Sequence, residues 1–182
     1  MSTKIEPLTL SDAPEAAAAT LKSLAAALGW VPNLYATVAR APHTLRGFLD
    51  WERLVARGSL SAREIELLKI HISEINGCAY CLSAHSELGR RAGLRPEELR
   101  AARLGHGATP REDALLALAR RIVSTGGSGA KGELARAREA GISDAELVDV
   151  IAVVALKSFT NAAAILTEAE IDFPLVDHPP RG

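Results

Sequence analysis

Cysteine is scarce in this sequence: 182 residues contain two, Cys78 and Cys81, three positions apart. A secreted protein held together by disulfides would normally carry more cysteines at wider spacings. A bond across three positions closes almost no loop of chain, so it would stabilise the fold little. The pair therefore makes better sense as chemistry than as a structural cross-link.

Excess charge and long apolar runs are also lacking. The formal net charge is -1, so the chain has no basic footprint for nucleic acid or acidic membranes. The N-terminal residues lack the apolar core of a secretory signal. The longest strongly apolar run, residues 150–156, is far shorter than the ~20 residues that a membrane span needs. We expect a cytoplasmic protein with no nucleic-acid or membrane partner.

Aromatic residues make up only 4% of the chain, whereas hydrophobic residues make up 48%, and much of that share is alanine. Alanine is the best helix former, because it loses no side-chain entropy and buries no polar group. No segment shows the sustained alternation of a β-strand. The sequence predicts an all-α fold, a compact multi-helix bundle forming a single domain over residues 1–182, with short terminal arms near 1–10 and 174–182.

Helix start and stop signals recur along the chain. Ser61 with Glu64, and Ser143 with Glu146, have the spacing of capping boxes, in which each residue satisfies the other's backbone N–H. Proline is tolerated in the first turn and glycine follows the last. These signals predict helices from Pro14 to near Gly29, from Pro32, over 42–57, from Ser61 to Asn76-Gly77, over 78–92, from Pro96 to Gly105, over 110–123 and from Ser143. The last should be a central, buried helix, because residues 150–156 are apolar on nearly all sides.

The most informative stretch is residues 66–85, ELLKIHISEINGCAYCLSAH. Cys78, Cys81 and His85 are spaced three and four apart, so a helix places them on one face. A histidine titrates near neutral pH and can serve as base and then acid. The local pattern predicts a dithiol/disulfide couple. Zinc binding and inert packing are alternatives, but no second cysteine pair completes a structural zinc site.

Three further residues are candidates for a supporting role. Glu66 lies among apolar neighbours on the preceding helix, where burial would point to function, but locally a surface ion pair with Lys69 or Arg63 is favoured. Glu74 is close to the Asn76-Gly77 break, which it could cap or solvate. Tyr80 lies between the cysteines, where it serves either as a hydrogen-bond donor or as a packing residue.

This stretch resembles the alkyl hydroperoxidase D-like group of the carboxymuconolactone decarboxylase superfamily. That group has a glutamate, a CxxC twelve residues later, and a histidine four residues after the second cysteine. Glu66, Cys78, Cys81 and His85 match each position. The resemblance is close over residues 59–95, and residues 31–45 and the segment around Asn161 resemble its peroxidase-related branch more loosely.

The resemblance implies an all-helical homo-oligomer (dimer, trimer or hexamer) that reduces hydroperoxides. It implies Cys81 as the attacking thiol, Cys78 as the resolving thiol, and Glu66 with His85 as the proton relay. No bound cofactor or metal is implied, and an external dithiol or thioredoxin-like protein would be the reductant. From position alone the order of the two thiols stays open, because the helix start favours Cys78 as thiolate and His85 favours Cys81.

One departure concerns the relay. Well-characterised hydroperoxidases of this group carry a histidine between the cysteines, where this chain has Tyr80. This puts peroxidase efficiency and the choice of reductant in doubt. The leading hypothesis is a thiol-dependent peroxidase, and the alternative is a redox-sensing or interaction protein that uses the same disulfide without efficient turnover.

Overall fold

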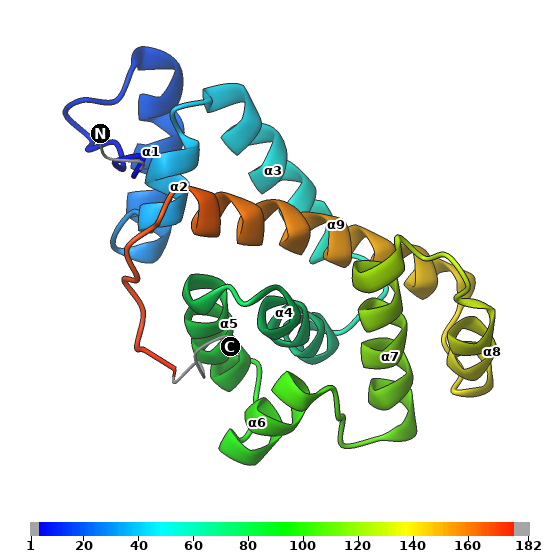
Figure 1. Cartoon of the computed structure of the whole chain (residues 1–182). Helices are drawn as coiled ribbons and strands as arrows, with labels where there is room; N and C mark the ends of the chain where they lie inside the picture. The colour runs from blue at the N-terminus through cyan, green and yellow to red at the C-terminus, as the bar shows by residue number, and fades with distance from the viewer. Residues whose placement is uncertain (1–3, 177–182) are drawn as a thin grey trace.

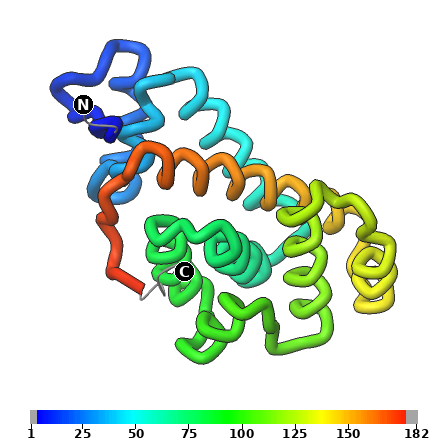
Figure 2. Tube along the Cα trace, in the orientation of Figure 1, coloured from blue at the N-terminus to red at the C-terminus, as the bar shows by residue number. Residues whose placement is uncertain are grey.

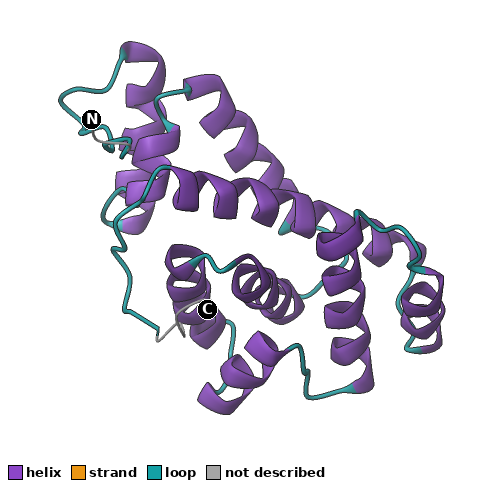
Figure 3. Ribbon diagram, viewed as in Figure 1, coloured by secondary structure: helices purple, strands orange, loops and turns teal. Residues whose placement is uncertain are grey.

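Nine α-helices and no β-strand form the part of the chain that the computed structural model describes, residues 4–176 (Figures 1 and 3). This confirms the all-α prediction. The helices are α1 (Glu15–Leu28), α2 (Asn33–Val38), α3 (Pro42–Val55), α4 (Ala62–Asn76), α5 (Ala79–Arg91), α6 (Pro96–Leu104), α7 (Pro110–Thr125), α8 (Lys131–Glu139) and α9 (Asp144–Leu166). The sequence signals did not mark α8, which carries no capping side chain.

The predicted helix boundaries around the CxxC segment are confirmed. Ser61 Oγ accepts from the Glu64 N–H at 3.2 Å, and Glu64 Oε2 accepts from the Ser61 N–H at 2.9 Å. Gly77 ends α4 with a φ of 63°, in the left-handed region that glycine adopts without strain. The chain then turns directly into α5, so α4 and α5 pack against each other across a very short connection.

Helix α4 is the centre of the bundle. It packs against α5, α6, α7 and α9, and five of its side chains belong to the main hydrophobic core. Helix α9 lies across this group and also contacts α2 and α3, which with α1 form the end of the molecule nearest the N-terminus (Figure 1). The five core residues of α4 are Ile65, Leu67, Leu68, Ile70 and Ile72.

Helix α9 departs from the prediction of a fully buried helix. Its inner face is buried against the bundle, but Val148 is 64% exposed, Ile151 54% and Leu166 76%. No described element covers this side of α9, so the prediction was right for one face only. By length and hydropathy alone α9 could cross a membrane. However, 44% of its most apolar 18-residue stretch is buried inside the bundle, as in a core helix.

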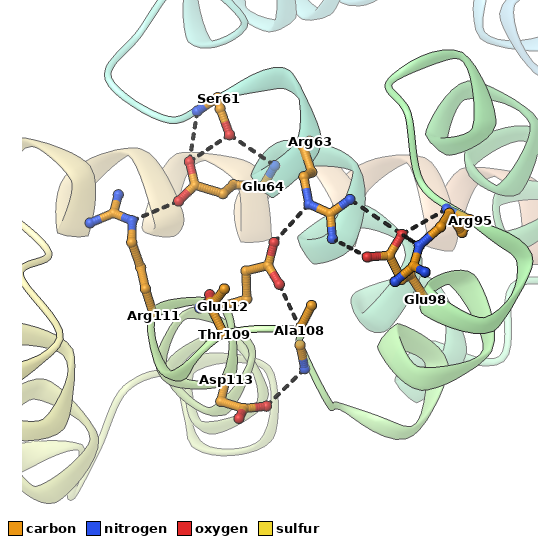
Figure 4. Close-up of polar contacts among 11 residues, drawn as sticks. Ser61, Arg63, Glu64, Arg95, Glu98, Ala108, Thr109, Arg111, Glu112 and Asp113 are labelled. Carbon is orange, nitrogen blue, oxygen red and sulfur yellow. Dashed lines mark hydrogen bonds and ion pairs between the residues drawn. The ribbon is translucent and has the colours of Figure 1, made fainter.

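A network of ion pairs ties the starts of four helices together at one side of α4, and Figure 4 shows the part of it that joins α4, α6 and α7. Arg63 binds Glu98 of α6 at 2.8 Å and Glu112 of α7 at 2.8 Å. Arg111 of α7 binds Glu64 at 2.7 Å and also contacts Glu146. Since Glu64 and Glu146 are the carboxylates of the two capping boxes, one arginine joins the N-termini of α4 and α9.

The C-terminal segment after Leu166 crosses the outside of the bundle. This arm, residues 167–176, leaves the end of α9 and passes α5 (Figure 2), and the Val176 N–H donates to Ser83 Oγ at 3.3 Å. Phe173 packs edge-on against both Trp30 and Tyr80, with ring centroids 5.9 and 5.7 Å away. The predicted arm began at 174, so its start lies earlier, and residues 177–182 are outside the described residues.

Candidate active site

The two cysteines lie where α5 begins. Cys78 is the N-cap, and its Sγ accepts from the Cys81 N–H at 3.3 Å. Ser73 anchors this start from the preceding helix, because its carbonyl oxygen accepts from the Cys78 N–H at 2.9 Å. Both side chains are buried, at 1% and 2% exposure, but Cys81 lines a cavity and Cys78 lies behind it. A small molecule entering the cavity therefore meets Cys81 first.

The surroundings of the two sulfur atoms favour Cys81 as the thiolate. The hydrogen bond from Cys78, followed by Lys157 and Thr160, lowers the pKa of Cys81 against the opposing effect of burial. The same pairing and burial raise the pKa of Cys78. On sequence grounds, the position at the helix start favoured Cys78 as the thiolate. The one backbone N–H that donates to the Cys78 sulfur does lower its pKa, but the pairing with Cys81 and burial raise it more.

Glu66 and His85 form a buried pair beside the cysteines. His85 Nδ1 and Glu66 Oε2 are 2.8 Å apart. Burial, with the nearby charge of Lys157, lowers the pKa of His85 to about 4, so the ring is neutral at pH 7. Because a carboxylate only accepts hydrogen bonds, Nδ1 carries the proton and Nε2 keeps its lone pair. The local prediction of a surface ion pair for Glu66 was wrong about the surface, since this carboxylate is buried, but Lys69, one of its two predicted partners, lies 3.8 Å away.

A second buried ion pair extends from Glu66. Lys69 Nζ lies 3.8 Å from Glu66 Oε1 and 2.6 Å from Glu52 Oε1. Burial alone would raise the pKa of Glu52, but Lys69 lowers it, so both carboxylates are ionised. Burial and the Glu52 carboxylate beside it raise the pKa of Tyr35, which stays a neutral phenol. Glu52 and Tyr35 also line the cavity, so a continuous polar chain borders it on one side.

The cavity has a volume of about 420 Å³ and lies between α2, α3, α5, α9 and the C-terminal arm. Its polar lining includes Cys81, His85, Lys157 and Thr160, together with the charged side chains of Glu52, Glu87, Arg91 and Asp172. The rest is mostly apolar, which is typical of a site that takes an organic ligand. Its aromatic wall consists of Trp30, Tyr35, Phe48, Tyr80 and Phe173.

The two supporting candidates lie in different places. Tyr80 lines the cavity, and its hydroxyl oxygen accepts from the Leu34 N–H at 3.3 Å. Burial and the nearby Asp172 carboxylate raise its pKa. Glu74 instead points toward α6, where it binds Arg103 at 2.6 Å, and it does not line the cavity. The structure therefore brings together Cys78, Cys81, His85, Glu66 and Tyr80, but not Glu74.

Sequence reasoning missed the residues that other helices contribute. Tyr35, Glu52, Lys157 and Thr160 come from α2, α3 and α9, and no short motif links them to the CxxC. One signal was present for Lys157: it is the single charged residue between Asp149 and Glu168, inside an otherwise uncharged run. A lysine in such a run is costly to bury and indicates function.

The zinc alternative needs several ligands at one point. Within residues 4–176, no group of three or more histidine, cysteine, aspartate or glutamate side chains is arranged to hold a metal ion. The nearest set, Cys78, Cys81, His85 and Glu66, has the imidazole Nδ1 already engaged by the carboxylate. This arrangement fits proton transfer better than metal coordination.

Comparison with solved structures identifies the fold. The chain superposes on a peroxidase-related protein with an alkylhydroperoxidase AhpD core from Ralstonia eutropha JMP134, with a TM-score of 0.83, 22% identity and 94% of each chain covered. It also superposes on a variant of the debrominase Bmp8 in complex with 2,3,4-tribromopyrrole, with a TM-score of 0.79 and 20% identity, covering 94% of this chain and 93% of that one.

Sequence comparison agrees with the fold. The protein YdfG of Bacillus subtilis (strain 168) is 34% identical over 53 residues, which are 29% of this chain and 36% of that relative's length. The model of the carboxymuconolactone decarboxylase family matches residues 38–121, which include the cysteines, Glu66 and His85. Residues 38–121 therefore resemble the carboxymuconolactone decarboxylase family, and the chain has the fold of the alkylhydroperoxidase D-like proteins.

Proposed function

We propose that this protein is a thiol-dependent peroxidase that reduces organic hydroperoxides. The observation that carries the proposal is that Cys81 and the neutral His85 line one largely apolar cavity, with Cys78 directly behind the first sulfur. An apolar wall suits the organic part of a hydroperoxide, and the sulfur lies where its peroxide oxygens would be held. The fold, shared with a peroxidase-related protein, supports the proposal.

The reaction cycle uses the two cysteines and the His85–Glu66 pair. His85 Nε2 takes the proton of Cys81, and Glu66 stabilises the imidazolium that forms. The thiolate attacks the terminal peroxide oxygen: an S–O bond forms, the O–O bond breaks, and the departing alkoxide takes the proton from His85. The Cys78 thiol then condenses with the sulfenic acid, giving a disulfide and one water molecule. An external dithiol reduces the disulfide and is itself oxidised.

This chemistry needs no bound cofactor or metal, because the two electrons come from the cysteine pair. The reductant must be a small dithiol or a thioredoxin-like protein in a reducing compartment such as the cytoplasm. Tyr80, in place of a relay histidine, contributes a neutral hydroxyl rather than a base. We therefore expect His85 alone to carry the proton.

A second candidate is reductive dehalogenation of an aromatic compound. The aromatic wall formed by Trp30, Tyr80 and Phe173 favours it, because these rings suit a flat ligand. The same dithiol would convert an aryl halide to the arene, with formation of the Cys78–Cys81 disulfide and release of one hydrogen halide, so the electrons balance. The fold of the debrominase Bmp8 is compatible with this chemistry.

The test compares the wild type with Cys81→Ser and Cys78→Ser. Each is given cumene hydroperoxide or a brominated pyrrole, with a dithiol reductant, and the sulfur products are identified by mass spectrometry. The peroxidase proposal expects no consumption by Cys81→Ser and a trapped sulfenic acid at Cys81 in Cys78→Ser. Full activity of Cys81→Ser would overturn it. Disulfide formation without turnover of either substrate would instead assign the protein to redox sensing.

We also propose that the protein self-associates through the exposed face of α9. Its exposed positions repeat every three or four residues and carry no charge, so a partner of opposite charge would have nothing to bind. A second copy offers the same uncharged stripe and fits it by two-fold symmetry. The stripe consists of Val148, Ile151, Ala155, Phe159, Ala162 and Leu166.

A further inference from the structure

Lys157 is a buried cation at the centre of an apolar helix. It is 3% exposed, lies in the middle of α9, and lines the cavity together with Cys81, His85 and Thr160. A buried ammonium group is costly unless an anion compensates it. The role of Lys157 therefore depends on which negatively charged group compensates its ammonium group.

The carboxylates near Lys157 already have other partners. Glu52 is 2.6 Å from Lys69, and Glu66 is 2.8 Å from His85. Among residues 4–176, Lys157 makes no ion pair with a carboxylate within 4.0 Å, although its charge acts on Glu52 and Glu66 from further away. By contrast, Lys157 and Cys81 line the same cavity, and the positive charge of Lys157 lowers the pKa of that thiol.

Several other groups face the Cys81 sulfur, and only Lys157 is a cation next to it. Cys78, at the start of α5, and Thr160 of α9 also lower the pKa of Cys81, and the Thr160 hydroxyl donates to the Leu156 carbonyl oxygen at 3.2 Å. His85 is neutral, and the side chains of α2 and α3 that border the cavity bring no positive charge. The other groups near the cavity include Tyr35 and Tyr80, which stay protonated, Glu52 and Glu66, which are anionic, and Lys69, whose charge is taken up by the two carboxylates. Asp172 also lines the cavity, as does Arg91 of α5, whose exposed side chain pairs with Glu87 at 3.2 Å.

We propose that Lys157 is the counter-ion of the Cys81 thiolate, and that by losing this partner on oxidation it makes the Cys78–Cys81 disulfide easier to reduce. The proposal deepens the proposed function and rests on it for its biological meaning. In the reduced state the ammonium group and the thiolate compensate each other. When the sulfur enters a disulfide it carries no charge, and the buried ammonium group is left without its anion.

The energetic consequence is a reduced form that is stabilised relative to the oxidised form. A dithiol whose thiolate is stabilised forms a more strongly oxidising disulfide. The disulfide is then readily returned to the dithiol by an external reductant, as a turnover cycle requires. Lys157 thus acts on both halves of the cycle: it stabilises the Cys81 thiolate that attacks the substrate, and it makes the Cys78–Cys81 disulfide easier to reduce.

The test uses Lys157→Met, which keeps the length of the side chain and removes its charge, with Lys157→Arg as the charge-retaining variant. Lys22→Met, on the exposed side of α1, is the matched control. The first measurement is the rate of iodoacetamide alkylation at Cys81 between pH 5 and 9, assigned by peptide mass spectrometry. We expect Lys157→Met to slow alkylation at least tenfold at pH 6.5, and Lys157→Arg and Lys22→Met to stay near the wild type.

The second measurement is the dithiol/disulfide equilibrium against glutathione. Lys157→Met should favour the disulfide at least tenfold, which is about 30 mV for a two-electron couple. Neither measurement needs peroxide turnover, so a failed peroxidase assay leaves this inference testable. An equilibrium within twofold of the wild type would overturn it, as would equal effects of Met and Arg. Circular dichroism checks that the variants are folded, which replacement of a buried charge by an apolar side chain of similar length should not impair.

Discussion

Glu66 Oε2 and His85 Nδ1 lie 2.8 Å apart, although the two residues are nineteen positions apart and belong to different helices. The break at Gly77 turns α5 back against α4 and brings the pair together. The hydrogen bond fixes which imidazole nitrogen is free to take a proton. The relay is therefore built by the same turn that places the cysteines at the start of α5.

Replacing Glu66 with glutamine should lower kcat/KM for an organic hydroperoxide by about tenfold to a hundredfold. The amide oxygen still accepts from Nδ1, but it no longer stabilises the imidazolium. Steady-state kinetics measure the loss. Glu139→Gln, on the exposed surface of α8, is the control and should be unchanged. Equal rates for both variants would show that Glu66 takes no part in the relay.

The unfolding free energy should fall as the pH drops from about 6.5 to 4.5. His71 and His85 are buried and neutral, with pKa values of about 4, because burial opposes their charged forms. The unfolded chain binds their protons near pH 6.5, so the unfolded state gains protons first as pH falls. Each histidine contributes at most about 1.4 kcal/mol per pH unit.

Urea denaturation at a series of pH values measures this slope. His71→Gln should reduce it, because one of the two groups is gone. Glutamates of the unfolded chain begin to take up protons at the lower end of this window, so the slope between pH 6.5 and 5.5 reports mainly the histidines. A flat profile between pH 4.5 and 6.5 would contradict neutral buried histidines.

Replacing Phe173 with alanine should raise KM for cumene hydroperoxide by about tenfold and leave the rate with hydrogen peroxide unchanged. The ring packs on Trp30 and Tyr80 and forms part of the aromatic wall, and each such aromatic pair contributes about 0.5–1.5 kcal/mol. Phe173→Leu keeps an apolar wall and should have a smaller effect. A parallel loss with both peroxides would mean that the arm supports the fold and not the ligand.

Replacing Arg111 with methionine should lower the unfolding free energy by about 1–2 kcal/mol, because it removes charge-assisted hydrogen bonds to Glu64 and Glu146 together. Arg53→Met is the comparison, since Arg53 makes one exposed pair with Asp50 and should cost under about 0.5 kcal/mol. Urea denaturation resolves the difference. Similar values for the two variants would mean that the network in Figure 4 adds nothing.

Replacing Ile151 with glutamate should produce a smaller species in size-exclusion chromatography with light scattering, because a charge would lie in the uncharged stripe on α9. Leu104→Glu introduces the same charge at an exposed position on α6 and should leave the mass unchanged. Circular dichroism should show both variants folded, since neither side chain is buried. A monomeric wild type would remove the basis of this prediction.

The helix boundaries could be predicted from sequence because their signals are local. Ser61 with Glu64 and Ser143 with Glu146 are three residues apart, and each pair closes its capping box as the spacing requires. The exposed face of α9 could not be predicted, because an apolar pattern does not say whether a second element covers it. The pattern is the same for a core and for an interface.

The site divides in the same way. Cys78, Cys81 and His85 are spaced three and four residues apart along one helix, so their proximity follows from helix geometry. Lys157, Glu52 and Tyr35 reach the cavity from three other helices, and only tertiary packing brings them together. The order of the two thiols was left open for that reason: the groups that favour Cys81 include Lys157 and Thr160, which lie far away in sequence.

The single left-handed residue between α4 and α5 has a consequence for sequence comparison. Each residue added to or removed from a helix rotates everything after it by about 100°. An insertion at Gly77 would therefore swing the imidazole of α5 away from its carboxylate, however well the CxxC itself were retained. Distant relatives that use the same proton route should keep this interval constant in length, even where most of the intervening letters differ.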